Sequence, residues 1–175
     1  IDVHDLDEAI AIAQRLPAAK KGTVEIRPTH PLSGLPVEAF DRLVAEVPAG
    51  GQAKYMLLCY DDAAAWRELG EAALNAAMQE AAGMCHELTR RHEYIIASPL
   101  ASVETATSVR LRDGKRWVTA GPFAETREFL GGYYLILARD LNDAVRVAAA
   151  HPGARHGTVE VRRVFDLAGA MPRSG

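Results

Sequence analysis

One segment of this sequence occurs twice, 135 positions apart, and this repeat constrains the fold more than any other feature. Ile1–Pro28 aligns with Ile136–Arg163 without a gap, and the two segments are identical at 12 of 28 positions. The agreement is strongest near the end, where "KGTVEIRP" in the first copy matches "HGTVEVRR" in the second. Agreement of this extent over an ungapped stretch indicates a true internal repeat.

Each copy is predicted to form a helix and then a strand. An aspartate stands at the N-cap position before the helix, Asp5 in the first copy and Asp140 in the second. After a glycine, apolar and polar residues alternate, as in a half-buried strand. The second copy also has a leading strand, "GGYYLILA" (Gly131–Ala138). Apolar residues at i, i+3, i+4 and i+7 give each helix one buried face: Leu6, Ala9, Ile10 and Ala13, and Leu141, Ala144, Val145 and Ala148.

We expect the repeat to divide the chain into four parts. Residues 54–167 form a complete domain, and residues 1–28 are the C-terminal strand–helix–strand part of a first repeat of the same kind. Residues 29–53 are predicted to be a linker with a short helix, and residues 168–175 a flexible tail. The first copy begins where its leading strand should be half finished. We therefore expect a further 82 residues, equivalent to Lys54–Leu135, upstream in a tandem of two domains packed as a pseudo-dimer.

An antiparallel α+β fold is predicted for the complete domain. The apolar run Lys54–Tyr60 is typical of a central strand, and a long alanine-rich helix follows it. Thr107–Ala120 is predicted to be a β-hairpin, because Asp113-Gly114 suits the two positive-φ positions of a type I′ turn. The element order is β-α-β-β-β-β-α-β. We therefore expect one antiparallel sheet of ferredoxin-like type, with all strands in it and both helices on one face.

Composition and charge exclude several classes of protein. The net charge of −3 gives no basic surface for nucleic acid. No apolar run reaches the roughly 18 residues that a membrane-spanning helix needs. The first residues do not resemble a signal peptide, so we expect a cytoplasmic protein. Cys59 and Cys85 lie in apolar surroundings without metal-ligand spacing, and they are predicted to be buried free thiols.

Three strings of this sequence resemble the YCII-related, or DGPF, family: "KYMLLCYDD" from Lys54, "VRLRDGKRWVTAGPFAETREFLGGYYLI" from Val109, and "DLNDAVRVAAAHPGARHGTVEVRR" from Asp140. The resemblance implies a bacterial protein with the dimeric α+β barrel fold. Two ferredoxin-like units then face each other, as a homodimer or as an intramolecular pseudo-dimer. Some relatives sit beside extracytoplasmic-function sigma factors, and one branch of the wider superfamily is a dehydrochlorinase. Most members have no assigned reaction.

The sequence departs from this family at two places. The aspartate that leads the family's Asp-Gly-Pro-Phe motif is replaced by Ala120. An Asp-Pro pair proposed for an acid–base dyad in one branch is replaced by His151-Pro152. The long helix has no histidine that matches the other half of that dyad unambiguously. The dyad cannot be carried over, and the sequence leaves open whether the protein is an enzyme.

The loop after the hairpin supplies most of the candidate site residues. We interpret it either as a rigid turn whose phenylalanine fills the core or as the rim of a cleft between the sheets. In a cleft, Glu125 is a candidate general base, and Arg127 would bind an anionic group. The alternative for Arg127 is a surface ion pair with Glu125 or Glu128. The candidate ligand-binding residues are Gly121, Pro122, Phe123, Arg127 and Tyr133.

His151 is the other candidate catalytic residue, and a histidine on the surface is its alternative reading. No Ser-His-Asp order, phosphate loop or metal cluster is present in the sequence, so we expect neither a cofactor nor a metal. Two functions stay open. One is a cofactor-free, dehydrochlorinase-like lyase acting on a small aromatic or anionic ligand. The other is a non-catalytic, ligand-sensing regulatory module that acts with a sigma factor. A buried carboxylate in the cleft would favour the enzyme, and a cleft filled by apolar side chains would favour the module.

Overall fold

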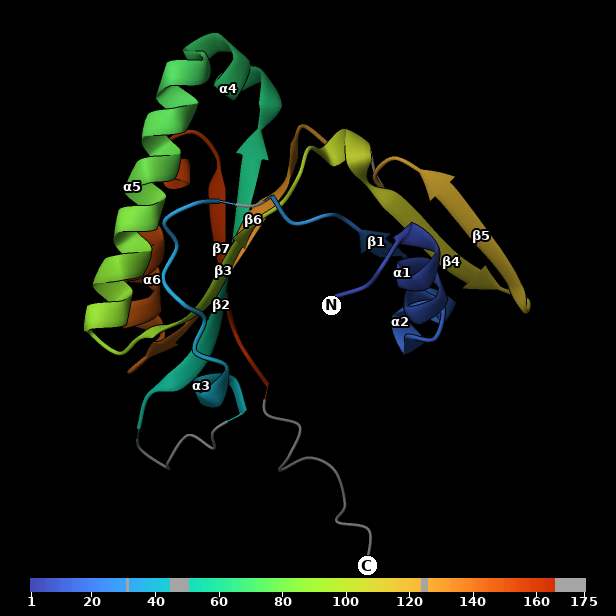
Figure 1. Ribbon diagram of the computed structural model, residues 1–175, viewed down its shortest axis with the longest axis horizontal. Coiled ribbons are helices and arrows are strands. Elements are labelled where there is room, and N and C mark those ends of the chain that lie inside the picture. Colours follow the sequence, from blue (N-terminus) through green and yellow to red (C-terminus); the bar gives the residue numbers. More distant parts are fainter. Residues whose placement is uncertain (31, 45–50, 124–125, 166–175) are drawn as a thin grey trace, which may run out of the picture.

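The computed structural model describes residues 1–30, 32–44, 51–123 and 126–165. These residues form two antiparallel sheets with helices packed on them (Figure 1). The strands are β1 (Val24–Ile26), β2 (Ala53–Asp62), β3 (Tyr94–Pro99), β4 (Thr107–Arg112), β5 (Lys115–Ala120), β6 (Glu128–Ala138) and β7 (Thr158–Arg163). The helices are α1 (Leu6–Ala13), α2 (Pro17–Lys21), α3 (Phe40–Val44), α4 (Ala63–Leu69), α5 (Glu71–Arg90) and α6 (Leu141–Ala150), with 3-10 turns η1 (Val103–Thr105) and η2 (Pro152–Arg155).

The four-stranded sheet is the body of the protein. Its strand order is β3-β6-β2-β7, and every neighbouring pair is antiparallel. Helices α5 and α6 cover one face of it (Figure 1). This arrangement confirms the predicted ferredoxin-like α+β fold. The main core between helices and sheet consists of Tyr55, Leu57, Cys59, Cys85, Leu88, Tyr94, Ala97, Tyr134, Ile136, Ala138, Ala144 and Ala148.

The two helices that belong to the repeat begin as their sequences predict. Asp5 accepts a hydrogen bond from the backbone N–H of Glu8, and Asp140 accepts one from Asp143. Each aspartate therefore caps its helix and satisfies one N–H group of the first turn. Among the helices in the described part of the chain, none is both long and apolar enough to cross a membrane.

The hairpin β4–β5 forms as predicted, but it lies outside the main sheet. Arg112 pairs with Lys115 across a turn in which Asp113 and Gly114 have φ values of 49° and 72°. Because β3 and β6 pair directly with each other, the hairpin that connects them in sequence is looped out.

The edge of β3 that faces away from β6 does not accept the hairpin, because another segment pairs with it. The backbone N–H of His30 donates to the Pro99 carbonyl, and that of Ala39 donates to the Ile95 carbonyl, both at 2.8 Å. The prediction of one sheet containing every strand is therefore wrong. Both sheets are open within the described ranges, so these residues close no barrel by themselves.

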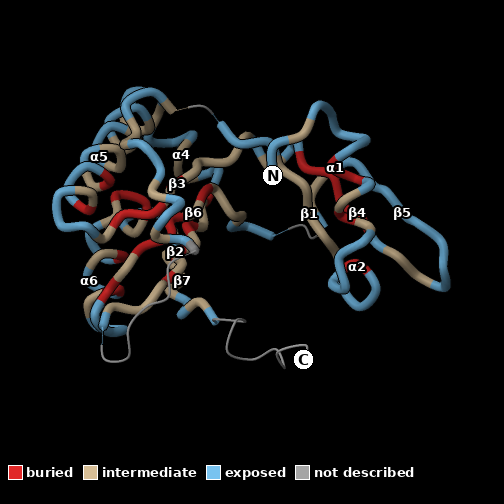
Figure 2. Tube along the Cα trace, turned by 60° about the horizontal axis from the view of Figure 1, so that its bottom comes forward, coloured by how far each residue is buried: buried red, intermediate tan, exposed pale blue. Residues whose placement is uncertain are grey.

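The first repeat copy packs on the looped-out hairpin. In the second sheet, of order β1-β4-β5, Val24 of β1 lies opposite Val109 of β4. A small second core consists of Ile10, Ala13 and Val109, with Val24 and Ile26 packed against it. Figure 2 shows it as a buried region separate from the main one. The helix of the first copy thus buries an apolar face on a sheet to which the complete domain contributes the β4–β5 hairpin.

Arg27 joins the two sheets. Its side chain is only 4% exposed, and it donates hydrogen bonds to the Ala101 carbonyl (2.8 and 3.1 Å) and to the Leu130 carbonyl (2.9 Å). Glu25 pairs with it at 3.2 Å. The guanidinium also lies over the ring of Phe129, 5.9 Å from its centre. A buried charge of this kind is stable only while its partners stay in place.

Replacing Arg27 with methionine is expected to lower the free energy of unfolding by about 2 kcal/mol, because two buried carbonyl groups lose their donor. Urea denaturation measures the change. The matched control is Arg162→Met, at the equivalent position of the second copy. Arg162 is 67% exposed and pairs with Glu160 on the surface, so a change within about 0.5 kcal/mol is expected there. Equal losses in the two variants would contradict the role given to Arg27.

Candidate functional site

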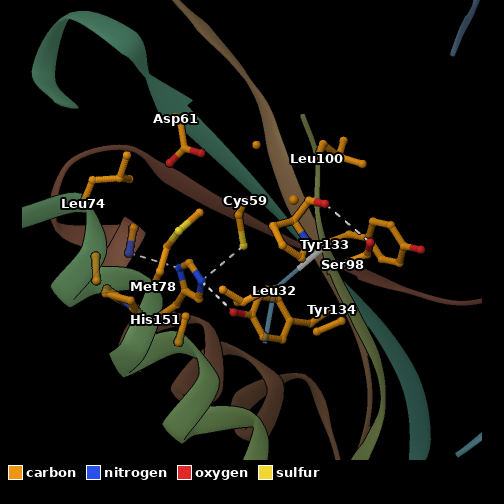
Figure 3. Close-up of a pocket in the computed structure, with 18 of the residues that line it drawn as sticks. Leu32, Cys59, Asp61, Leu74, Met78, Ser98, Leu100, Tyr133, Tyr134 and His151 are labelled. Atoms are coloured by element: carbon orange, nitrogen blue, oxygen red, sulfur yellow. Dashed lines mark hydrogen bonds between the residues drawn. The ribbon is translucent and has the colours of Figure 1, made fainter. Parts of the chain in front are cut away.

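A pocket of about 350 Å³ lies between α5 and the helix-covered face of the main sheet. Figure 3 shows its interior. Strands β2, β3 and β6, helix α5 and turn η2 all contribute to its walls. The apolar walls include Leu32, Leu35, Leu74, Ala77, Met78, Ala81, Ala97, Leu100 and Phe129. The side chains with polar atoms include Cys59, Asp61, Trp66, Ser98, Ser102, Tyr133, Tyr134 and His151.

Asp61 is the carboxylate of this pocket. It lies near the end of β2, on the same side of the strand as Leu57 and Cys59, which face the core. Its Oδ1 accepts a hydrogen bond from Trp66 Nε1 at 3.0 Å. Burial raises the pKa of Asp61, although the hydrogen bond from Trp66 acts in the opposite direction. A carboxyl group with a raised pKa is a stronger base than an ordinary one once it is ionised.

Gly131 makes room for this carboxylate. A Cβ atom at position 131 would lie 1.7 Å from Asp61 Oδ2, which no real structure tolerates. The pairing of β2 with β6 also shifts at this point, because Cys59 lies opposite Gly132 and Tyr60 opposite Leu130. Gly131 is thus the extra residue of a β-bulge, a feature that often re-aims a side chain near a functional site.

His151 lies in the pocket wall as a neutral ring. Its Nδ1 accepts a hydrogen bond from the Gly153 N–H at 3.1 Å, so the proton of the neutral ring is on Nε2. That nitrogen faces the Tyr134 hydroxyl at 3.0 Å and Cys59 Sγ at 3.8 Å. Burial lowers the pKa of His151 to about 4. With its lone pair engaged by Gly153, the ring is poorly placed to accept a proton from a ligand.

The two cysteines are free and buried, as predicted. Burial raises the pKa of Cys59 and of Cys85 to about 12. Burial also raises the pKa of Tyr134. The reactive form of a cysteine is the thiolate, and neither thiol is ionised near neutral pH. Asp61 is therefore the group in the described pocket wall that is best suited to exchange a proton with a ligand.

Of the five residues predicted to bind a ligand, one lies in this pocket. Tyr133 is among its lining residues. Gly121, Pro122 and Phe123 are not, and Phe123 is 59% exposed, so its ring does not fill the core. Gly121 has a φ of 92°, a value at which glycine is favoured. Glu125 lies outside the described residues.

Arg127 forms an ion pair with Asp62. Its Nε lies 2.7 Å from Asp62 Oδ2, and its side chain is 87% exposed. Asp62 also caps α4 by accepting hydrogen bonds from the N–H groups of Ala64 and Ala65. The guanidinium beside it and these hydrogen bonds lower the pKa of Asp62. Anion binding by Arg127 stays a prediction, and such an anion would compete with Asp62.

Asp61 was not among the residues that the sequence singled out. The neighbouring aspartate, Asp62, caps α4 instead. The signal that could have found Asp61 is the alternation of β2. Tyr55, Leu57 and Cys59 are buried on one face, and the same period of two places Asp61 on that face.

The segment between the first copy and the complete domain, residues 29–53, contributes to the pocket wall. Leu32 and Leu35 line it, and Leu35 also packs on the main core. The segment is held in place by His86 of α5, whose Nε2 lies 2.7 Å from the Gly34 carbonyl. The residues expected to form a linker therefore supply part of the ligand-facing wall.

The fold and the site define an α+β domain with a mainly apolar pocket and one half-buried carboxylate, Asp61. The family model for the YCII-related domain matches residues 53–168, about two thirds of the chain. The chain belongs to the YCII-related family. No curated protein matches it. The match includes Asp61, His151 and most of the pocket wall, but not Leu32 and Leu35.

Proposed function

We propose that this protein binds a small, uncharged, mainly aromatic molecule in the pocket under α5 and that Asp61 exchanges a proton with it. The observation that carries the proposal is a carboxyl group enclosed by apolar walls, with one oxygen fixed by Trp66. Sites for small molecules typically combine apolar walls with a few convergent polar groups. A carboxyl group with a raised pKa in such a place is a candidate functional group.

The charge of Asp61 favours a neutral ligand that carries a proton donor. An anionic ligand would bring a second negative charge into a site of low polarity, at a cost that grows as the dielectric falls. A phenol or an activated C–H compound instead offers a proton to Asp61 Oδ2. Arg127, the residue expected to favour an anion, pairs with Asp62 and does not line this pocket.

The reaction class that fits is proton abstraction without a cofactor. Asp61 would take a proton from a carbon of the substrate, and the electron pair of the broken C–H bond would form a new double bond. In an elimination, the leaving group departs with its bonding electrons, as a dehydrochlorinase-like lyase requires. In an isomerisation, Asp61 returns the proton to another carbon. A single base can serve either reaction.

Asp61→Asn is expected to abolish turnover and to weaken the binding of phenol by about tenfold or more, because the amide cannot accept the proton. Isothermal titration with phenol and with benzoate tests the charge argument, since the wild-type protein should prefer phenol. The matched control is Asp113→Asn. This substitution makes the same chemical change at the hairpin turn, where asparagine tolerates the positive φ.

Three results would contradict the proposal. Benzoate could bind the wild-type protein more tightly than phenol does. Phenol could bind the Asp61 and Asp113 variants equally well. Alternatively, bound ligand could fail to shift the amide resonances of residues lining the pocket.

A second function, ligand binding without chemistry, is favoured by the state of His151. Its Nδ1 is engaged by Gly153, and its Nε2 by Tyr134, so it does not complete an acid–base pair with Asp61. In this case Asp61 would only hydrogen-bond the ligand, and the domain would act as a sensing module. An extracytoplasmic-function sigma factor is the partner that the family resemblance implies. The two functions differ in one measurement, which is solvent deuterium exchange into the bound ligand.

A further inference from the structure

Strand β1 has one edge that pairs with no strand in the described part of the chain. It pairs with β4 on one side only, since the second sheet has the order β1-β4-β5. In an antiparallel strand, successive residues direct their N–H and C=O groups to alternate edges. The hydrogen bonds of the neighbouring strands therefore reveal which residues of β1 face β4 and which face the open side.

The residues of β1 that face β4 are Val24 and Ile26. The Gly121 N–H donates to the Ala106 carbonyl at 2.7 Å, so Ala106 and every second residue after it face β5. Thr107 and Val109 then face β1, and their partners are Ile26 and Val24. The backbone groups of Glu25, together with those of Thr23 and Arg27, are directed to the open edge.

This open edge is the one that the second copy uses to join its own sheet. In β7, the Val164 N–H donates to the Lys54 carbonyl at 2.9 Å, so Glu160 and Arg162 also face β2. The repeat offset of 135 makes Glu160 equivalent to Glu25, and Arg162 equivalent to Arg27. The hairpin has therefore joined the outer edge of β1, and the inner edge, where a strand like β2 belongs, is free.

The repeated glycine supports this reading independently. A Cβ atom on Gly157 would lie 2.1 Å from the Tyr60 carbonyl oxygen of β2, so the strand beside it permits no side chain. Gly22 occupies the equivalent position, yet a Cβ there would meet nothing closer than 3.4 Å, the Ala18 carbonyl of its own helix. The first copy therefore has the glycine that a closely approaching β2-like strand would require. In the described residues, no such strand lies beside it.

In the second copy, the strand on this edge is β2, which lies between β6 and β7. Among the described residues, no strand pairs with the equivalent edge of β1.

We infer that the inner edge of β1 binds the β2-equivalent strand of the first repeat. In this antiparallel arrangement, Glu25 lies opposite the residue equivalent to Leu58, as Glu160 does in the second copy. The β4–β5 hairpin is then no substitute for that strand. The hairpin extends the sheet of the first repeat from the opposite side of β1, so that the complete domain contributes two strands to that sheet. Unpaired edges are sites at which strand addition occurs.

The test is a fused chain in which a second copy of residues 54–135 precedes Ile1, which preserves the repeat register. Amide hydrogen exchange is measured by NMR at Glu25 and Arg27, with Val24 and Ile26 as internal references. In the 175-residue chain without the added copy, the first two amides should exchange fast and the references slowly. In the fused chain, the exchange of Glu25 and Arg27 should slow by about tenfold or more, while the references stay protected.

The matched control is the same fused chain with proline in place of the added copy of Leu58, because proline in the middle of a sheet disrupts the pairing of its strand. It should lose the protection at Glu25. Three results would overturn the inference. The added segment could stay unfolded beside a folded second domain. Val24 and Ile26 could lose protection, which would make the hairpin a substitute. Finally, Glu25 could become protected in the 175-residue chain as its concentration rises, which would assign the edge to a second molecule.

Discussion

His151→Asn is expected to remove a loss of stability that the wild-type protein undergoes between pH 6.5 and about 4. Burial lowers the pKa of His151 from 6.5 to about 4 in the folded protein. Between these values the unfolded chain binds a proton at this position and the folded protein does not. The free energy of unfolding therefore falls as the pH is lowered through this range, by on the order of 3 kcal/mol in total. Above pH 6.5 the histidine has no such effect.

Asparagine is the substitution that isolates this effect. His151 caps η2 by accepting the Gly153 N–H, and asparagine can accept the same hydrogen bond because it is a favoured N-cap residue. Urea denaturation at pH 7 and at pH 4.5 should show a smaller difference for the variant than for the wild-type protein. The same substitution at exposed His4 controls for the loss of one histidine, and its pH dependence should match that of the wild type. Parallel curves for His151→Asn and the wild type would contradict the prediction.

Asp61 acts in the opposite direction over part of this range. A carboxyl group with a raised pKa binds its proton more readily in the folded protein than in the unfolded chain, so its contribution to stability rises as the pH falls. Measuring both residues as asparagine variants separates the two effects. The comparison also tests whether Asp61 lowers the free energy of unfolding at neutral pH. Functional groups often have such a cost in stability.

Local features of the fold could be read from the sequence because each depends on a few neighbouring residues. The N-cap aspartates Asp5 and Asp140 begin helices as expected. The Asp113-Gly114 turn pairs its two strands in the expected register, with Arg110 opposite Trp117. The predicted buried faces of the two repeated helices are confirmed only in part. Ala9, Ile10 and Ala13 are buried, as are Ala144 and Ala148. The other predicted members of these faces are exposed: Leu6, Leu141 and Val145.

The partner of the hairpin could not be read in the same way. Its strands alternate as any half-buried strand does, and β3, β6 and β1 all offered antiparallel edges. The outcome depends on two contacts that are distant in sequence. One is the occupation of the β3 edge by residues 28–30 and 39, and the other is the burial of Arg27 against Ala101 and Leu130. Neither leaves a periodic signal.

The candidate site was only partly predictable for a related reason. The Gly-Pro-Phe loop stands out in the sequence as a cluster of unusual residues, so it supplies most of the predicted site residues. Asp61 is instead a single aspartate at the end of an apolar strand. Its position in the pocket depends on the alternation of β2 and on the bulge at Gly131. His151 was a candidate, yet its hydrogen bonds to Gly153 and Tyr134 could be known only from the structure.

Gly157→Ala is expected to lower the free energy of unfolding by about 3 kcal/mol, because the new Cβ would overlap the backbone of β2. The nearest atom, the Tyr60 carbonyl oxygen, would lie 2.1 Å away, and a backbone oxygen in a paired strand cannot move aside alone. Separation of β7 from β2 would also displace Asp61, whose Cα is 3.5 Å from the same position. Calorimetry of phenol binding should therefore show weaker affinity, in addition to the lower stability in urea.

The repeat supplies the control for this prediction. Gly22→Ala makes the same change at the equivalent position, where the nearest atom is 3.4 Å away and no neighbouring strand is present. A change within about 0.5 kcal/mol is expected in the 175-residue chain, and equal losses at both glycines would contradict the prediction. In the chain fused to a second copy of residues 54–135, the same Gly22→Ala substitution should become as destabilising as Gly157→Ala. The added β2-like strand would then place a second backbone carbonyl group against Gly22, as Tyr60 does against Gly157.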